Sequence, residues 1–139
     1  LQYRVTVIDN RKEILDQIEK ADKIIHDEYK DALDNEKFVP NSFFIIATYQ
    51  HQYDEVVLHK IYNSDWKPRY IGMVSSKSKK DIIYNNLTEK ISDPNLDLCY
   101  LPVGLDIGGA SPDEIAISII AEIQKIKYGQ TGRHLRDVT

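Results

Sequence analysis

Short strands and helices alternate along this chain of 139 residues, and this alternation limits the possible folds more than any other feature. Apolar runs rich in β-branched residues predict strands, and apolar residues at helical spacing predict the helices between them. Strict alternation of this kind builds parallel βαβ units. The expected fold class is α/β, a Rossmann-like three-layer fold with a mostly parallel sheet. Strands are expected at residues 3–8, 23–26, 42–47, 70–74 and 98–103, and helices at 10–20, 54–62, 78–90 and 112–128, with a short helix or turn at 27–35.

The last helix has a complete start signal. Ser111 is expected to cap it, Pro112 to occupy its first position and Glu114 to complete a capping box, while Gly129 ends it. Asn10 with Glu13 predicts a second capping box near the start of the chain.

Several side chains have mainly structural interpretations. The last helix is apolar almost all round and is expected to be buried, so Ser118 and Glu122 should face a wet stripe or bond a neighbouring loop. Cys99 is expected in the core. Trp66 is either packed in a loop or an exposed anchor for a partner.

Composition excludes several classes of protein. Lysine and arginine total 18 against 22 acidic residues, which leaves no broad cationic face for nucleic acid. A single cysteine rules out an internal disulfide and a cysteine-cluster metal site, and no metal site is predicted. No apolar run is long enough to span a membrane and no signal peptide opens the chain, so we expect a cytoplasmic protein.

The chain enters its first strand without an initiator methionine. We therefore expect residues 1–139 to be a single Rossmann-like domain that is truncated at its amino terminus. A dinucleotide site needs a first strand and a G-x-G-x-x-G turn, with an acidic residue about 20 residues later. Asp9 occupies the place of that acidic residue, yet no glycine precedes Gly72. We predict that the absent strand leaves a slot between strands 3–8 and 42–47, to be filled by another segment or a swapped partner.

Candidate ligand-binding residues follow three of the predicted strands, at the edge where open α/β sheets bind ligands. Asp9 is either a ribose ligand or a helix cap. Thr48, His51 and Asp54 follow strand 42–47, where His51 is either a ligand and proton-transfer group or a solvated surface histidine.

A phosphate of molybdopterin or of a nucleotide would suit the next loop, since a helix start lies behind it. The alternative is a helix capped by Ser78 with Asp81, beside solvated lysines. The candidate residues in this loop are Gly72, Ser75, Ser76 and Lys77.

The last glycine-rich loop contributes Gly104, Asp106 and Gly108 to the candidate site. Its glycines would let the backbone approach an anion at the start of the following helix. Asp106 stands between Leu105 and Ile107 and is expected to be partly enclosed. It would then either orient a ligand or tie the turn to backbone amides.

Residues 101–123, LPVGLDIGGASPDEIAISIIAEI, closely resemble the carboxyl-terminal Rossmann domain of the xanthine dehydrogenase accessory family. The resemblance extends over almost the whole chain. YRVTVIDNR resembles the family's second Rossmann strand, TYQHQYD its T-H-x-x-x-x-D segment and YIGMVSSKSK its Y-I-G-x-x-G-S-x-R segment, and the terminal GRHLRDV is also similar. Tyr49 stands where the family usually has histidine, and Ser75 where it often has glycine.

The resemblance implies a maturation factor for xanthine or carbon monoxide dehydrogenases. Such a factor binds molybdenum cofactor, protects it during sulfuration and delivers it to a molybdenum hydroxylase. The implied partners are the hydroxylase apoenzyme and the cofactor sulfurase, and we expect a homodimer in which strand exchange is one option. The cysteine used by the family lies in a separate domain, so Cys99 does not inherit that role.

Two other functions stay open. An NAD(P)-dependent oxidoreductase would need a proton donor, for which His51 is the only candidate near the crevice. An interaction or dimerisation module would have all three loops covered by another protomer.

Overall fold

The computed structural model describes residues 1–139 and has the predicted alternation of strands and helices. No helix in it is both long and apolar enough to cross a membrane. In chain order the elements are β1 (Thr6–Asp9), α1 (Lys12–Leu15), β2 (Lys23–His26), α2 (Tyr29–Asn35), β3 (Phe43–Ile46), α3 (His51–Tyr62), β4 (Tyr70–Met73), η1 (Lys77–Lys79), α4 (Lys80–Lys90), η2 (Leu96–Leu98), β5 (Cys99–Tyr100), α5 (Pro112–Tyr128) and η3 (Leu135–Asp137).

The strands form two separate parallel sheets. One contains β1 and β2, with Thr6 opposite Lys23, and the other has the order β3-β4-β5, with Phe43 opposite Tyr70. β1 and β3 are not paired with each other. The predicted parallel α/β arrangement is confirmed, and the two strands expected to flank a slot have no ladder between them.

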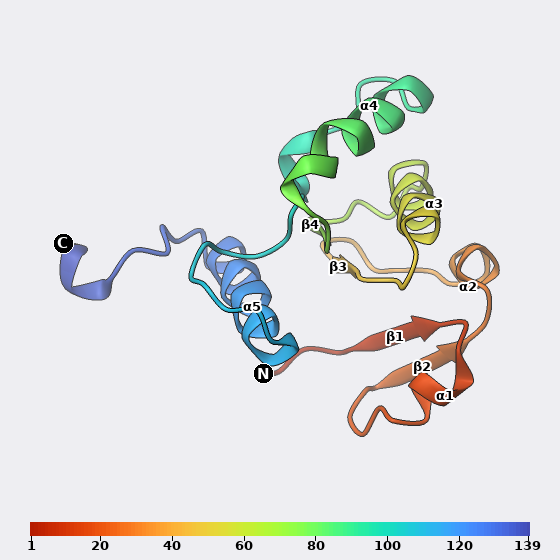
Figure 1. Ribbon diagram of the computed structural model, residues 1–139, viewed down its shortest axis with the longest axis horizontal. Helices are drawn as coiled ribbons and strands as arrows, with labels where there is room; N and C mark the ends of the chain where they lie inside the picture. The colour runs from red at the N-terminus through yellow and green to blue at the C-terminus, as the bar shows by residue number, and fades with distance from the viewer.

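Helices cover both faces of the three-stranded sheet, with α3 and α4 on one side and α5 on the other (Figure 1). Alternate residues of β4 explain this, because Ile71 and Met73 face the larger core while Tyr70 faces α5. Leu58 of α3 and Leu87 of α4 are completely buried in the larger core. In the smaller core, Tyr70 packs with Ile119 and Ile123 of α5.

Helix α5 begins at the residue predicted from the sequence. The Ser111 hydroxyl accepts from the Glu114 amide, the Glu114 carboxylate accepts from the Ser111 amide, and Pro112 is the first helical residue. Gly129 ends the helix in the left-handed conformation.

Two other predicted helix starts are wrong. Helix α1 is only four residues long and has no side-chain cap, because Asn10 bonds Tyr49 and Glu28 instead of its own helix. Helix α4 begins at Lys80 behind the turn η1, with no cap from Ser78, whose hydroxyl pairs with that of Ser76. The side chain expected to cap the helix is hydrogen-bonded elsewhere in both cases: Asn10 to residues of other elements, and Ser78 to a neighbouring hydroxyl.

The expected burial of α5 and β3 is only partly correct. Helix α5 buries Ser118, Ile119, Glu122 and Ile123, whereas Ile117 is 62% exposed. The apolar run of β3 has no alternating polar positions, which is typical of a strand covered on both faces, yet Ile45 is 47% exposed. Both apolar surfaces therefore lack a packing partner within these 139 residues.

The structure confirms the prediction for Cys99 and supports the packed alternative for Trp66. Cys99 is buried in the core, and burial raises the pKa of its thiol. Trp66 is packed in its loop, with its ring 4.7 Å from that of Phe38 and stacked on Phe44 at 5.8 Å between centroids.

Candidate functional site at the carboxyl edge of the strands

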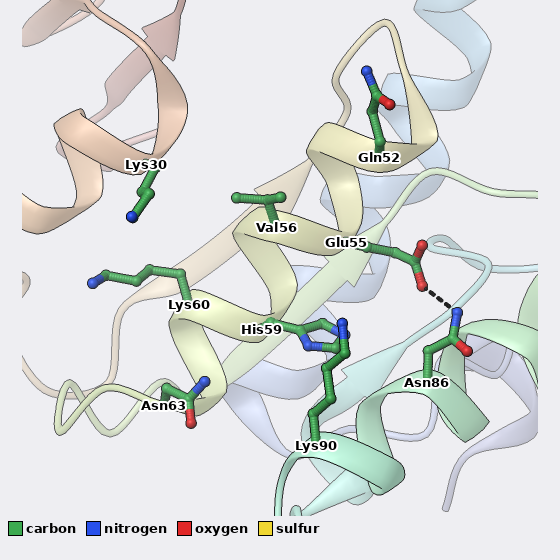
Figure 2. A pocket seen from close by; sticks show the side chains of 9 residues that line it. All are labelled: Lys30, Gln52, Glu55, Val56, His59, Lys60, Asn63, Asn86 and Lys90. Atoms are coloured by element: carbon green, nitrogen blue, oxygen red, sulfur yellow. Dashed lines mark hydrogen bonds between the residues drawn. The ribbon is translucent and has the colours of Figure 1, made fainter.

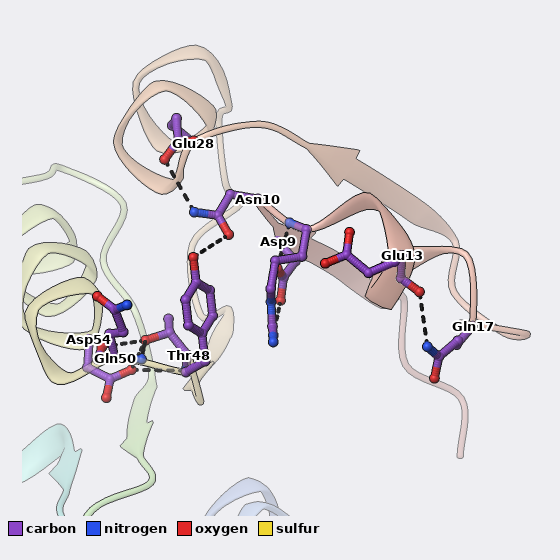
Figure 3. Close-up of polar contacts among 10 residues, drawn as sticks. Asp9, Asn10, Glu13, Gln17, Glu28, Thr48, Gln50 and Asp54 are labelled. Carbon is purple, nitrogen blue, oxygen red and sulfur yellow. Dashed lines mark hydrogen bonds and ion pairs between the residues drawn. The ribbon is translucent and has the colours of Figure 1, made fainter.

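The carboxyl ends of β1 and β3 are joined by side chains. Tyr49 lies three residues after β3, and Asn10 lies directly after β1. The Tyr49 hydroxyl donates a hydrogen bond of 3.1 Å to the side-chain oxygen of Asn10. The Arg11 guanidinium lies 4.2 Å from the centre of the Tyr49 ring. Figure 3 shows this group of polar contacts, which brings the loop after β1 close to Thr48 and Asp54 after β3.

Asp9 is held by its own turn. The Arg11 side chain donates two hydrogen bonds of 3.0 Å to Asp9, from Nε to one carboxylate oxygen and from a terminal nitrogen to the other. The backbone amide of Arg11 donates a third, of 2.9 Å. Partial burial opposes ionisation, but the hydrogen bonds and charge of Arg11 prevail and lower the pKa of Asp9. Both oxygens already have donors, so a ribose hydroxyl would have to compete with Arg11.

A buried tyrosine lies beside this ion pair. The Tyr29 hydroxyl has no hydrogen-bond partner, and burial together with the charge of Asp9 raises the pKa of Tyr29 to about 12.

Thr48, His51 and Asp54 do come together, as predicted. The Asp54 side chain is only 4% exposed, and its Oδ1 accepts from the Thr48 amide at 2.9 Å and the Thr48 hydroxyl at 2.6 Å. Its Oδ2 lies 3.7 Å from Nδ1 of His51, whose side chain is 58% exposed. The buried carboxylate thus orders the loop after β3 and faces an accessible imidazole.

The loop after β4 carries exposed hydroxyl and ammonium groups. Ser75 bonds only the carbonyl of Ser76, and the Ser76 and Ser78 hydroxyls lie 3.0 Å apart. Lys77 makes no ion pair, while Lys79 contacts Nε2 of His51. The last contact joins the loops after β3 and β4 and was not anticipated from the sequence.

Gly72 is explained by packing. It is buried in β4, and a Cβ atom there would lie 2.5 Å from Cγ2 of Val103 and 2.6 Å from the Tyr70 hydroxyl. The space that a side chain would fill is therefore occupied by protein atoms. No ligand is needed to account for glycine at this position.

The last glycine-rich loop is tied to α5 by two polar residues. Glu122 accepts from the Tyr70 hydroxyl at 2.7 Å and from the Gly104 amide at 2.9 Å, and Ser118 donates to the Leu105 carbonyl at 2.7 Å. This confirms the prediction that they bond a neighbouring loop. Burial and the bond to Glu122 raise the pKa of Tyr70.

Two positions of that loop point to solvent. Asp106 is exposed, contrary to the partial enclosure expected from its apolar neighbours, because Leu105 folds back onto Ser118 and leaves Asp106 outside. Gly108 has a φ of +83° and no atom near the space of a side chain, so its glycine serves the turn.

Two hollows lie away from this edge. A groove of about 970 Å³ runs between α5 and the terminal segment and includes Ile107, Ile117, Ile120 and Leu135. The other, of about 420 Å³, surrounds the outer face of α3 (Figure 2). Among its charged residues, Lys60 pairs with Asp34 and Glu55 accepts from Asn86, whereas Lys30 and Lys90 form no ion pair. No predicted site residue lines either hollow.

Reasoning from the sequence missed four residues that shape the site: Arg11, Tyr49 as a bridge, Lys79, and Tyr70, which shares Glu122 with the last glycine-rich loop. Arg11 had a local signal, because it stands two residues after a carboxylate at a strand end. The contacts of the other three span 28 to 52 positions in sequence, which no local pattern indicates.

Parallel strands, helices on both faces and polar loops at the carboxyl edge define an α/β domain of Rossmann type. Residues 1–123 match the XdhC Rossmann domain family. The chain belongs to this family, as its resemblance to the xanthine dehydrogenase accessory proteins predicted.

Two of the similar proteins carry the name of xanthine dehydrogenase. The chain is 31% identical over 104 residues to a probable xanthine dehydrogenase subunit of Bacillus subtilis (strain 168), and the match covers 75% of this chain and 29% of that protein. It is 32% identical over 94 residues to the uncharacterized protein YqeB of Escherichia coli (strain K12), covering 67% of this chain and 17% of that protein. A crystal structure of a xanthine dehydrogenase from Bacillus halodurans has a TM-score of 0.77 at 30% identity, covering 93% of this chain and 37% of that one. The chain thus spans well under half the length of each.

Proposed function

We propose that this chain is part of a maturation factor for a molybdenum hydroxylase of the xanthine dehydrogenase type. Its crevice would bind molybdenum cofactor, or a nucleotide, for delivery to the apoenzyme. The observation that carries the proposal is the contact between His51, which follows β3, and Lys79, which follows β4, with the Ser76 hydroxyl close to Lys79 in sequence, supported by membership of the XdhC family.

The donor set fits the phosphate end of a pterin cofactor. Ammonium, imidazole and hydroxyl groups bind phosphate oxygens, and these groups are exposed after β3 and β4. The sulfur chemistry of the cofactor finds no partner in this chain, because Cys99 is buried in the core. We therefore propose that this chain binds the cofactor through its phosphate group.

A further strand would complete the crevice. Long side chains bridge β1 and β3 near both ends of the strands: the rings of Tyr3 and Phe43 lie 6.4 Å apart, and the Tyr49 hydroxyl bonds Asn10. No backbone hydrogen bonds pair the two strands. One inserted strand needs about 4.8 Å on each side. We propose that a segment outside residues 1–139 occupies this slot and brings the missing turn. Direct pairing of β1 with β3 in a structure of the full-length protein would contradict this.

Calorimetry of the full-length protein with molybdenum cofactor and with NAD(P) tests the proposed function. Binding of molybdenum cofactor is expected. The Arg11→Ala variant should bind it as the parent does, because Arg11 belongs to the ribose end of the crevice. For a nicotinamide enzyme the same variant should alter NAD(P) affinity, since it frees both oxygens of Asp9. Binding of neither compound would contradict a cofactor crevice.

The exposed face of α5 favours a second candidate function, association of two copies. The helix is acidic in its first turn at Asp113 and Glu114 and basic in its last at Lys125 and Lys127. An antiparallel pair of α5 helices would join the acidic end of each copy to the basic end of the other, around Ile117.

Ile117→Asp is expected to convert a dimer to monomers, as measured by light scattering, because it places a charge in that apolar contact. Ile82→Asp is the matched control, since Ile82 of α4 is 61% exposed and lies outside the groove. A parent protein that is monomeric, or a dimer that both variants leave intact, would contradict the α5 interface.

A further inference from the structure

His51 stands between a buried carboxylate and a lysine. Its Nδ1 lies 3.7 Å from Oδ2 of Asp54, and its Nε2 contacts the ammonium of Lys79. Thr48 supplies two donors to the other carboxylate oxygen, which leaves Oδ2 free to face the imidazole. His51 is the first residue of α3 and Lys79 the last of η1, so the pair closes the space between two crevice loops.

The contact with Lys79 assigns the proton on His51. An ammonium can only donate, so Nε2 must accept and the ring proton sits on Nδ1, toward Asp54. Lys79 forms no ion pair with any carboxylate in the chain. Its positive charge is therefore uncompensated where it meets the imidazole.

We propose that Lys79 and His51 form an oxyanion subsite for a phosphate group, and that His51 takes up one proton when the anion binds. Phosphate oxygens would take the donors of Lys79, which leaves Nε2 of His51 without one. A proton from solvent then converts the ring to imidazolium, which donates from Nε2 to phosphate and pairs through Nδ1 with Asp54. Asp54 and Lys79 are the charged groups that contact the ring.

The subsite rests on the proposed cofactor crevice and specifies the part of the ligand that it holds. A phosphate ester of a pterin cofactor and the diphosphate of a dinucleotide share this chemistry. The hydroxyls of Ser76 and Ser78 lie in the turn that carries Lys79 and add neutral donors on the same side.

Titration calorimetry of the full-length protein with inorganic pyrophosphate, in two buffers of different ionisation enthalpy, measures both affinity and proton uptake. The parent is expected to bind with net proton uptake. Lys79→Met should weaken binding about tenfold or more, the value of a charge-assisted hydrogen bond. His51→Gln should lower the proton uptake by one proton relative to the parent, because an amide can donate but cannot take up a proton.

Lys80→Met is the matched control, since it removes the same charge one residue later and the Lys80 ammonium lies 5.7 Å from the centre of the Tyr84 ring, without a contact to His51. We expect a loss below about threefold for it. Equal losses for the two lysine variants, or unchanged proton uptake in His51→Gln, would overturn the subsite.

Competition separates the two possible sources of the phosphate and the two proposals. The compound that displaces pyrophosphate, molybdenum cofactor or NADPH, identifies the ligand class. If molybdenum cofactor binds independently of Lys79 and without displacing pyrophosphate, the subsite assignment fails and the proposed function stands. If pyrophosphate binds as expected and neither cofactor does, the proposed function fails and the subsite stands.

Discussion

Replacing Glu122 with alanine is expected to lower the free energy of unfolding by about 3 kcal/mol. The carboxylate is buried and accepts from the Tyr70 hydroxyl and the Gly104 amide. Its removal leaves both donors in the interior without an acceptor and opens a cavity beside α5. The glycine-rich loop would also lose one of its attachments to the helix.

Urea unfolding followed by circular dichroism measures this loss, and hydrogen exchange of the Gly104 amide reports the loop directly. Gln124→Ala is the matched control, because Gln124 is exposed on the same helix two residues later. It should change stability by about 0.5 kcal/mol or less. A Glu122→Ala protein that is as stable as the control, with unchanged exchange at Gly104, would contradict the role of Glu122 as the anchor.

The start of α5 shows which features the sequence could predict. Ser111 and Glu114 satisfy each other within one turn, so nothing distant competes with the motif. The Asn10 and Glu13 pair has the same spacing and fails, because Tyr49 and Glu28 reach Asn10 from other elements. A local motif is a safe prediction only where the fold brings no better partner to it.

Burial was harder to predict than secondary structure. Strand β2 has the predicted bounds, and the apolar pattern of β3 and α5 correctly gave a strand and a helix. Yet Ile45 and Ile117 are exposed. An apolar pattern predicts that a surface is covered in the functional protein, but it does not identify the segment or partner that covers it. Both residues lie where we propose additional protein, at the slot and at the α5 groove.

The candidate site divides in the same way. Thr48 and Asp54 are six residues apart and were predicted together, since both follow the same strand. Lys79 joins His51 only because β3 and β4 are neighbours and their loops meet at one edge. Strand order is a property of the whole chain, so the pairing of those loops could not be derived from either segment alone.

Gly72→Ala is expected to destabilise the protein by about 2 kcal/mol without any ligand present. The added Cβ would lie 2.5 Å from Cγ2 of Val103 and 2.6 Å from the Tyr70 hydroxyl, which is itself fixed by Glu122. Gly72 lies in a regular strand, where alanine costs no backbone strain, so overpacking is the source of the loss.

A double-mutant cycle in urea unfolding checks that source. In a Val103→Ala background the closest contact is removed, and Gly72→Ala should cost less than in the parent, with the Tyr70 contact accounting for the rest. Equal costs in the two backgrounds would show that Val103 does not set the requirement for glycine. Gly72 would then be free to serve the ligand edge, as the sequence alone had suggested.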